Sequence, residues 1–388
     1  MLRALAPNDR ALAVAIATEV CRHAVSLDAL IDAQTREPLG HDLKVRQALR
    51  IALVQALGLR VAEHAAIATV LPLLSGGPRR LLHGVFGAVL RSGVTLPPVP
   101  ELPLAVAERW EAAWGAEACR AIAAALAAPP PLDLSLRDAS ETSAWAERLG
   151  ATSVAPGHLR LPRGRAVVDL PGFGDGAWWV QDLAASLPAR LLGDGGGRRV
   201  LDVGAAPGGK TMQLAAAGWQ VTALDASARR AQRLRDNLTR VGLDAEVVVG
   251  DGRALPPDRQ YDAVPLDAPC SATGIARRHP DVLHRIESRD IADRAALQVE
   301  LLDAAARAVR PGGRLVFATC SLEPEEGEAQ LVRFLAAHDD WRLAPVTADE
   351  LPAGLAPTAD GAVRTLPSML AEAGGLDGFF IARLERAG

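Results

Sequence analysis

The sequence lacks the features that mark membrane and secreted proteins. None of its apolar runs reaches the length of a transmembrane helix, and its first ten residues carry charges and a proline where a signal peptide needs an unbroken apolar core. Cysteine is scarce, and Cys21, Cys119, Cys270 and Cys320 show no close spacing of the metal-ligand or redox type. We therefore expect a cytoplasmic protein without membrane contact, disulfides or a bound metal.

A strong net charge is also absent. The formal net charge is −4 over 388 residues, so any RNA site has to be a local basic patch. Lysine is rare, since Lys44 and Lys210 are the two lysines among 42 basic residues. Because Lys210 stands in a glycine-rich stretch of a chain that otherwise uses arginine, the sequence indicates that a compact ammonium group is needed there.

The N-terminal third, residues 1–125, is rich in alanine and leucine at helical spacing and predicts an all-α domain. Three prolines at 129–131 mark its end. Residues 126–185 predict a small α+β extension. Within it we expect strands at 132–137 and 158–161 and a helix at 143–149.

The remaining residues, 186–388, alternate between strand and helix patterns, which predicts an α/β fold with a doubly wound, Rossmann-like sheet. We expect strands at 198–203, 220–224, 245–250, 261–267, 313–319 and 377–384, and helices at 209–217, 226–241, 290–309 and 325–337. Pro265 falls inside the fourth of these strands. Because proline has no N–H to donate, it predicts a bulge or a local loss of ladder pairing.

The centre of this domain is the stretch Val200–Thr211, which predicts a buried strand, a turn of small residues and a helix start. Such a turn lets a ligand touch the backbone and places the first N–H groups of the helix against it. The alternative is a strand–helix turn without a ligand. The small residues of the turn are Gly204, Ala205, Ala206, Gly208 and Gly209.

Two ligands compete for this turn. Gly204 to Thr211 matches the phosphate-loop pattern G-x-x-x-x-G-K-[ST], which would make the chain a nucleotide triphosphatase with Lys210 on the phosphates. However, the next apolar run ends in Asp225, where a carboxylate can bind ribose hydroxyls. Asp251 follows the third strand and can contact an adenine amino group, its alternative being a turn residue. The two acids favour a nucleoside such as S-adenosylmethionine.

Two cysteines follow neighbouring strands. The fourth strand runs into Asp267-Ala-Pro-Cys270, and the fifth into Thr319-Cys320. Because parallel strands end at one edge of the sheet, both thiols are expected beside the glycine turn. Paired thiols with a methyl donor suit methylation of pyrimidine carbon 5, where one thiolate first adds to carbon 6 and a second thiol assists release.

Four motifs, in this order along the chain, resemble those of the Sun-type bacterial ribosomal RNA cytosine-5 methyltransferases. The motifs are Val203–Thr211, Asp267–Gly274, Arg277–Asp281 and Ala318–Glu328. The resemblance covers roughly residues 130–388. The helical part, residues 1–125, resembles more weakly the NusB-like RNA-binding domain of such enzymes, and we expect it to be shortened by about its first helix.

The resemblance implies that S-adenosylmethionine is the cofactor, that Cys320 is the nucleophile and that Cys270 assists release. It also implies a set of residues that bind or border the cofactor: Gly204, Ala205, Ala206, Pro207, Gly208, Gly209, Lys210, Asp225, Asp251 and Asp267. Asp267 would in addition hold the polar edge of the cytosine and raise its electrophilicity. Three residues would lie on the RNA side, the alternative being exposed loop charges: Arg277, Arg278 and His279.

These observations together predict a monomeric, S-adenosylmethionine-dependent RNA cytosine-5 methyltransferase. The expected substrate is 16S ribosomal RNA, with the target base unstacked in a loop or in a partly assembled particle. Transfer RNA stays open as a substrate. The alternatives from other classes are the phosphate-loop triphosphatase and a non-catalytic RNA-binding assembly factor, and the presence of Cys320 argues against the latter.

Overall fold

The computed structural model describes residues 6–41, 43–256 and 259–388, and the chain folds into two compact units. The first comprises Met1–Ala128 together with Arg278–Arg285, and the second comprises Pro129–Arg277 together with Ile286–Gly388. Residues 1–5 of the charged N-terminal stretch lie outside the described residues. Across the described part of the chain, no helix is long and apolar enough to cross a membrane.

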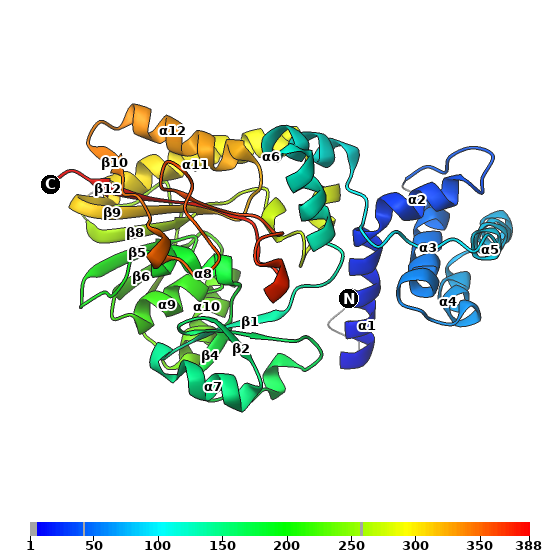
Figure 1. Cartoon of the computed structure of the whole chain (residues 1–388), viewed down its shortest axis with the longest axis horizontal. Helices are drawn as coiled ribbons and strands as arrows, with labels where there is room; N and C mark the ends of the chain where they lie inside the picture. The colour runs from blue at the N-terminus through cyan, green and yellow to red at the C-terminus, as the bar shows by residue number, and fades with distance from the viewer. Residues whose placement is uncertain (1–5, 42, 257–258) are drawn as a thin grey trace. The chain divides into compact units, whose positions relative to one another are not determined.

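The first unit is helical, as predicted (Figure 1). Its helices are α1 (Pro7–Arg22), α2 (Ala24–Asp32), α3 (Lys44–Leu53), α4 (Glu63–Val70), α5 (Gly76–Arg91) and α6 (Leu104–Ala125). Apolar residues at helical spacing form the core, including Leu27, Leu49 and Phe86. Arg46 is buried in this unit and lies 2.9 Å from Asp28 and 2.5 Å from Asp32, so two carboxylates neutralise its charge.

A short segment from the C-terminal half of the sequence also belongs to the first unit. It contains the 3-10 helix Pro280–His284, which contacts α1. The Nε2 atom of His284 lies 2.7 Å from the carbonyl oxygen of Cys21, and Val282 and Leu283 are buried. The chain therefore leaves the second unit after Arg277 and returns to it eight residues later.

The second unit begins with a small four-stranded sheet in the order β2-β3-β1-β4. Its elements are β1 (Leu132–Leu136), α7 (Thr142–Leu149), β2 (Thr152–Ala155), β3 (His158–Leu161) and β4 (Trp178–Val180). The strands β2 and β4 were not predicted. Inside the sheet, Arg160 makes a two-pronged hydrogen bond to Asp133, with both N–O distances at 2.7 Å.

The main sheet runs in the order β10-β12-β9-β8-β5-β6-β7, and β11 pairs with β12. Its strands are β5 (Arg199–Val203), β6 (Gln220–Asp225), β7 (Glu246–Val249), β8 (Tyr261–Asp267), β9 (Val309–Thr319), β10 (Trp341–Leu343), β11 (Val363–Thr365) and β12 (Phe379–Arg386). The strands from β9 to β7 are parallel, and β12 is antiparallel to β9. The predicted doubly wound α/β fold is confirmed.

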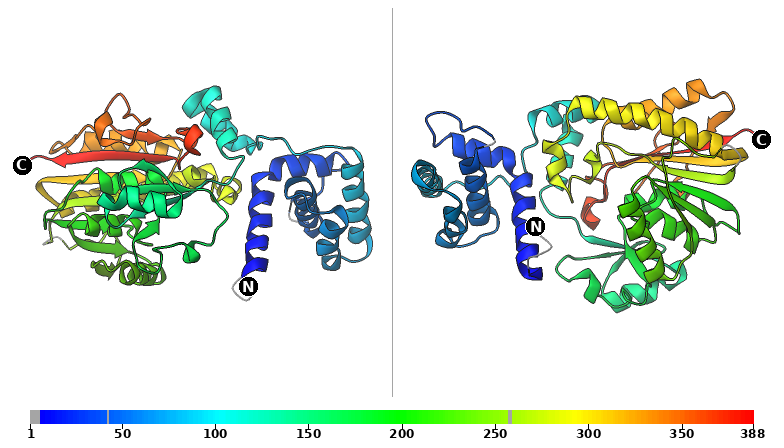
Figure 2. Two further views of the ribbon diagram at one scale, coloured as in Figure 1. Left: turned by 60° about the horizontal axis from the view of Figure 1, so that its bottom comes forward. Right: turned by 180° about the vertical axis from the view of Figure 1, so that it is seen from behind.

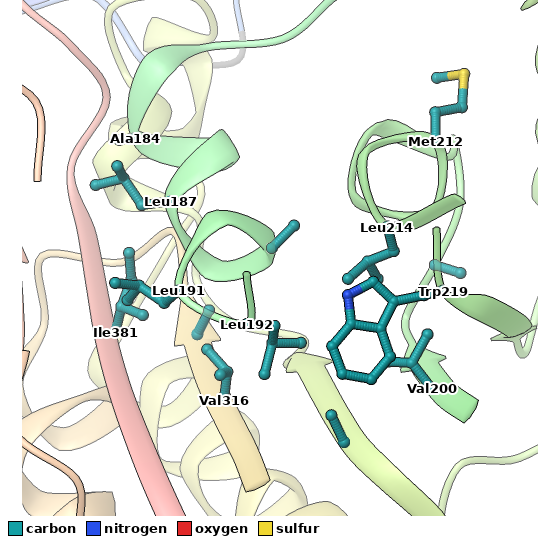
Figure 3. Close-up of a cluster of buried hydrophobic side chains, with 14 of the residues drawn as sticks. Ala184, Leu187, Leu191, Leu192, Val200, Met212, Leu214, Trp219, Val316 and Ile381 are labelled. Carbon is teal, nitrogen blue, oxygen red and sulfur yellow. The ribbon is translucent and has the colours of Figure 1, made fainter. Parts of the chain in front are cut away.

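Helices cover both faces of this sheet (Figures 1 and 2). They are α8 (Leu183–Arg190), α9 (Gly209–Ala216) and α10 (Ala228–Val241) on one face, and α11 (Ser288–Ala308) and α12 (Glu328–Ala337) on the other. Alternate strand residues enter the two cores, so Val316 packs with the first group and Phe317 with the second. Figure 3 shows the first core, where Leu187 and Ile381 lie near Val316.

Pro265 interrupts the sheet on one side of β8. The ladder with β9 continues through it, because Pro265 lies opposite Val316, and the register shift in that ladder falls between Tyr261 and Ala263. On the other side, β8 pairs with β5 at Ala263 and at Leu266, on either side of the proline. The expected loss of pairing is therefore found towards β5, where the missing N–H costs a ladder bond.

Candidate active site

The turn between β5 and α9 is built around two glycines in the left-handed region. Gly204 has φ of 79°, and a Cβ there would lie 2.4 Å from the carbonyl oxygen of Asp267. Gly208 has φ of 111°, and a Cβ there would lie 2.4 Å from Leu234 Cδ1. A Cβ at Gly204 would clash with the backbone at the end of β8, and the positive φ at both positions favours glycine.

Asp225, at the end of β6, holds the turn in shape. Its buried carboxylate accepts hydrogen bonds from the backbone N–H of Ala206, at 3.1 Å, and of Ser227, at 2.9 Å. The guanidinium of Arg230 lies 3.5 Å from the same carboxylate and donates to the carbonyl oxygen of Ala206. Arg230 was not predicted as part of the site, because an arginine in the first turn of a helix gives no such signal in the sequence.

Asp251 follows β7 at the same edge and is exposed. Arg253 folds back on it, with N–O distances of 2.6 to 3.0 Å, and also reaches Glu300 at 3.0 Å. The hydrogen bonds from the Arg253 side chain, then the one from its backbone, lower the pKa of Asp251 to about 2. Asp251 is therefore a charged acceptor at neutral pH.

Lys210 and Asp267 join the glycine turn to the end of β8. The Nζ atom of Lys210 lies 2.8 Å from Oδ2 of Asp267, and the Lys210 side chain is buried while that of Asp267 is about one-third exposed. Burial lowers the pKa of Lys210, but the charge and hydrogen bond of Asp267, then the charges of Asp202 and Cys320, outweigh it, so the pKa is raised. Lys210 thus carries a compact positive charge beside Cys320.

The two predicted thiols meet at this edge. Cys270 Sγ lies 3.5 Å from Cys320 Sγ, which confirms the expectation that they are close in space. Two backbone hydrogen bonds hold their loops together, from Ala268 N to Ala318 O at 2.9 Å and from Gly274 N to Cys320 O at 3.0 Å. The hydrogen bond with Cys320, then burial and the charge of Cys320, raises the pKa of the Cys270 thiol well above its usual range.

A buried carboxylate that the sequence did not single out lies behind the thiols. Glu326 is fully buried and accepts hydrogen bonds from the backbone N–H of Ser271, at 2.8 Å, and from its hydroxyl, at 2.6 Å. Burial raises the pKa of Glu326, and the hydrogen bonds from Ser271 and Ser321 oppose that shift. The sequence surrounds Glu326 with other glutamates, so nothing in the pattern distinguishes the buried one.

The three residues expected on the RNA side differ in burial and in the unit to which they belong. Arg277 is 3% exposed and donates to the carbonyl oxygen of Gly374, so the alternative of an exposed loop charge does not apply to it, and its contact with RNA stays a prediction. Its role here is to fix a turn 97 residues further along the chain. Arg278 and His279 lie in the segment that joins the first unit, where Arg278 is half-buried and His279 is exposed.

The chemistry of this edge fits S-adenosylmethionine. The cofactor offers ribose hydroxyls, amino groups and a positive sulfonium, all of which carboxylates accept or attract. Carboxylates stand at or just after the ends of β6, β7 and β8, at Asp225, Asp251 and Asp267, and β6 and β8 flank β5, whose end carries the glycine turn. The buried Oδ1 atom of Asp202 adds an acceptor without a hydrogen-bond partner among the described residues.

Comparison with known proteins gives the family. The family model "16S rRNA methyltransferase RsmB/F" matches residues 189–385, and the NusB family model matches residues 2–93. The chain is 35% identical to ribosomal RNA small subunit methyltransferase B of Sodalis glossinidius, over 98% of this chain and 90% of the relative. The chain belongs to the RsmB/F family of 16S rRNA methyltransferases. The enzyme of the same name from Klebsiella pneumoniae is 36% identical, over 97% of this chain and 90% of the relative.

Solved structures agree with this assignment. The crystal structure of PH0851 is 25% identical and has a TM-score of 0.77, covering 99% of this chain and 91% of that one. A methyltransferase homolog protein from Pyrococcus horikoshii is 26% identical with a TM-score of 0.61, covering 77% and 98%. NSun6 from the same organism, solved with SFG, is 20% identical with a TM-score of 0.64, covering 74% and 98%, and shows the fold alone.

Membership of this family decides several expectations. A NusB domain followed by a Rossmann-like methyltransferase domain is confirmed, as is S-adenosylmethionine as the cofactor. The protein is a methyltransferase that acts on ribosomal RNA. The triphosphatase interpretation of the glycine turn loses its support, because Lys210 is engaged with a carboxylate and the family transfers methyl groups.

Proposed function

We propose that the protein methylates carbon 5 of a cytosine in 16S ribosomal RNA, with Cys320 as the attacking thiol and Cys270 as the thiol that assists release. The observation that carries this proposal is the 3.5 Å separation of the two sulfur atoms at the cofactor edge. Carbon 5 of cytosine is too weak a nucleophile to take a methyl group unaided. An exocyclic amine needs no such help, so paired thiols favour the ring carbon.

In the first step, the Cys320 thiolate adds to carbon 6. A bond forms between Sγ and carbon 6, and the electron pair of the carbon 5–carbon 6 double bond moves towards carbon 5. Asp267 is exposed enough to accept a hydrogen bond from the amino group of the base, and Lys210 fixes its orientation.

Carbon 5 then takes the methyl group that S-adenosylmethionine supplies from the glycine turn. Carbon 5 now carries both a methyl group and a proton. Loss of that proton restores the double bond and expels Cys320 from carbon 6 as a thiolate. The protein residue that takes the proton has to be a base close to Cys320, and Cys270 is the group at that position.

The electrostatic coupling of the thiols supports this order of events. The causes that raise the pKa of Cys270 begin with the hydrogen bond to Cys320, and they include the charge of Cys320. Once Cys320 is bonded to carbon 6, its charge and its capacity for that hydrogen bond are reduced. Cys270 is thereby made more acidic after attack, so it can release its own proton to solvent once the adduct has formed, and its thiolate then takes the proton from carbon 5.

The test is methylation in vitro followed by mapping of the product. The full chain is incubated with S-adenosylmethionine and either 16S ribosomal RNA or transfer RNA from cells that lack the protein, and 5-methylcytosine is located by bisulfite sequencing. We expect one protected cytosine in 16S RNA. Methylation of transfer RNA alone, or of an exocyclic amine, overturns the proposal, and absence of methylation on both RNAs favours the non-catalytic assembly factor.

A further inference from the structure

Glu326 connects the two loops that carry the thiols. It precedes α12 in the sequence, yet its carboxylate lies beside Ser271, the neighbour of Cys270. Its backbone carbonyl accepts a hydrogen bond from the hydroxyl of Thr319, the neighbour of Cys320, at 3.0 Å. One residue is thus bonded to the chain positions adjacent to both sulfur atoms.

Hydroxyl groups extend this connection between the loops. The hydroxyl oxygens of Ser271 and Ser321 are 3.1 Å apart, and each of these serines directly follows one of the two cysteines. The Thr273 hydroxyl oxygen lies 3.5 Å from both and accepts from the backbone N–H of Leu322 at 3.0 Å. These side chains are buried, so water does not compete for their bonds.

The energetics suggest a purpose beyond stability. A buried carboxylate loses its hydration, and even a well-bonded one is seldom more stabilising than apolar side chains of the same volume. The carboxylate instead fixes the orientation of Ser271, because its two oxygens accept hydrogen bonds from the backbone N–H and the hydroxyl of that residue at the same time. A fixed Ser271 backbone fixes the position of Cys270, which matters when a misplacement of about 1 Å costs about 100-fold in rate.

We propose that Glu326 is a positioning residue that sets the distance between the Cys270 and Cys320 thiols. This rests on the proposed function for its catalytic consequence, but the spacing itself is a property of the free protein. Glu326 is fully buried, so its side chain is not available to contact a base or a cofactor at the surface. It acts through Ser271 and Ser321, and its removal lets the two loops shift relative to each other.

The test measures spacing and catalysis separately. Phenylarsine oxide bridges two neighbouring thiols, forming two As–S bonds with release of one water, so its affinity reports the distance between the thiols without RNA or cofactor. The variants are Glu326→Ala and Glu326→Gln, and Glu325→Gln is the matched control because Glu325 is the exposed neighbour. Cys270→Ala provides the value for a single thiol.

We expect Glu326→Ala to weaken arsenical binding at least about tenfold, since the second bond to arsenic no longer forms at its preferred geometry. Its kcat should fall about 100-fold, while KM for RNA and the Kd for S-adenosylmethionine stay within about twofold of wild type because the buried Glu326 side chain is not available to either ligand. Glu326→Gln keeps one acceptor oxygen and should lie between alanine and wild type. Glu325→Gln should match wild type in all measurements.

Each outcome bears on one proposal. Unchanged arsenical affinity in Glu326→Ala overturns the positioning role, whatever the activity. Weaker arsenical binding in a protein whose wild type makes no 5-methylcytosine supports the positioning role and overturns the proposed function. If Glu326→Ala does not fold, the Glu326→Gln variant decides, since equal arsenical affinity and equal kcat for Glu326→Gln and wild type count against the proposal.

Discussion

The ammonium of Lys210 lies 2.8 Å from the carboxylate of Asp267, and this pair ties the cofactor turn to the strand end that precedes Cys270. The lysine is on the first turn of α9 and the aspartate is the last residue of β8. Methyl transfer needs the cofactor and the base in a fixed relation. The Lys210–Asp267 ion pair joins α9, beside the proposed cofactor turn, to the end of β8, beside the proposed site of the base, and so fixes the distance between the two sites.

Replacing Lys210 by methionine should therefore separate binding from catalysis. The apolar part of the side chain is retained, but Asp267 loses its partner and the positive charge near Cys320 disappears. We expect kcat to fall about 10- to 100-fold, because Asp267 is no longer held in place. Steady-state kinetics measure this. A Lys44→Met variant in the first unit serves as control.

Replacing Asp225 by alanine should weaken cofactor binding. The change removes the proposed ribose acceptor and also the bonds that hold Ala206 and Ser227 in place. We expect a loss of about 1.5–3 kcal/mol in the binding free energy of S-adenosylmethionine, measured by calorimetry. Asp244→Ala, at an exposed position after α10, should leave the affinity unchanged. Equal affinity for Asp225→Ala and wild type would contradict the assignment of this residue.

The buried carboxylate of Asp202 predicts a pH dependence of stability. Burial raises its pKa to about 6, against the opposing effects of Thr211 and Lys210. Between pH 4 and 6 the native protein keeps a proton that the unfolded chain has lost, so the free energy of unfolding falls as the pH rises through this window. Above pH 6 the buried carboxylate is charged, and the full cost of ionising it lowers the free energy of unfolding by on the order of 3 kcal/mol.

Asp202→Asn removes this penalty and keeps an acceptor for the Thr211 hydroxyl, which lies 2.6 Å from Oδ2. Without cofactor, the variant should be more stable than wild type at pH 7.5, and the difference should shrink towards pH 4.5. Thermal unfolding at both pH values measures it. A difference that does not change with pH would show that Asp202 does not titrate in this range.

The sequence predicted the parallel strands and their helices because apolar runs and helical periodicity are local signals. It also predicted the meeting of Cys270 and Cys320, since parallel strands end at one edge. It missed β10 and β11, which are three residues each and depend on pairing with β12. Such short strands form because they pair with another strand, and the sequence of a short segment does not show which strand it pairs with.

The sequence also did not reveal which charged residues are buried. Arg277 stands among charged residues, as an RNA contact would, but its partner carbonyl lies 97 residues away. Glu325 and Glu326 are adjacent and identical in type, yet one is exposed and the other fully buried. Composition cannot separate such neighbours, because the difference comes from the direction in which a short 3-10 turn points each side chain.

The two thiols should differ in what their removal does to the reaction, although they lie only 3.5 Å apart. Cys320→Ser should abolish both methylation and any covalent protein–RNA complex, because a hydroxyl at its ordinary pKa is a far weaker nucleophile than a thiolate. Cys21→Ser, in the first unit, is the control and should keep wild-type activity. Methylation by Cys320→Ser would contradict the assignment of the nucleophile.

Cys270→Ala should instead stall the reaction after methyl transfer. Cys320 can still attack and carbon 5 can still take the methyl group, but the base that lies beside Cys320 is missing, so the carbon 5 proton is not removed and the thioether is not expelled. A protein–RNA complex that survives denaturing electrophoresis should accumulate, and labelled methyl should migrate with it. If the trapped complex appeared with Cys320→Ala and not with Cys270→Ala, the attacking thiol would be Cys270. The contact between the thiols argues for the first outcome, because it raises the pKa of Cys270 and so disfavours Cys270 as the thiolate that attacks.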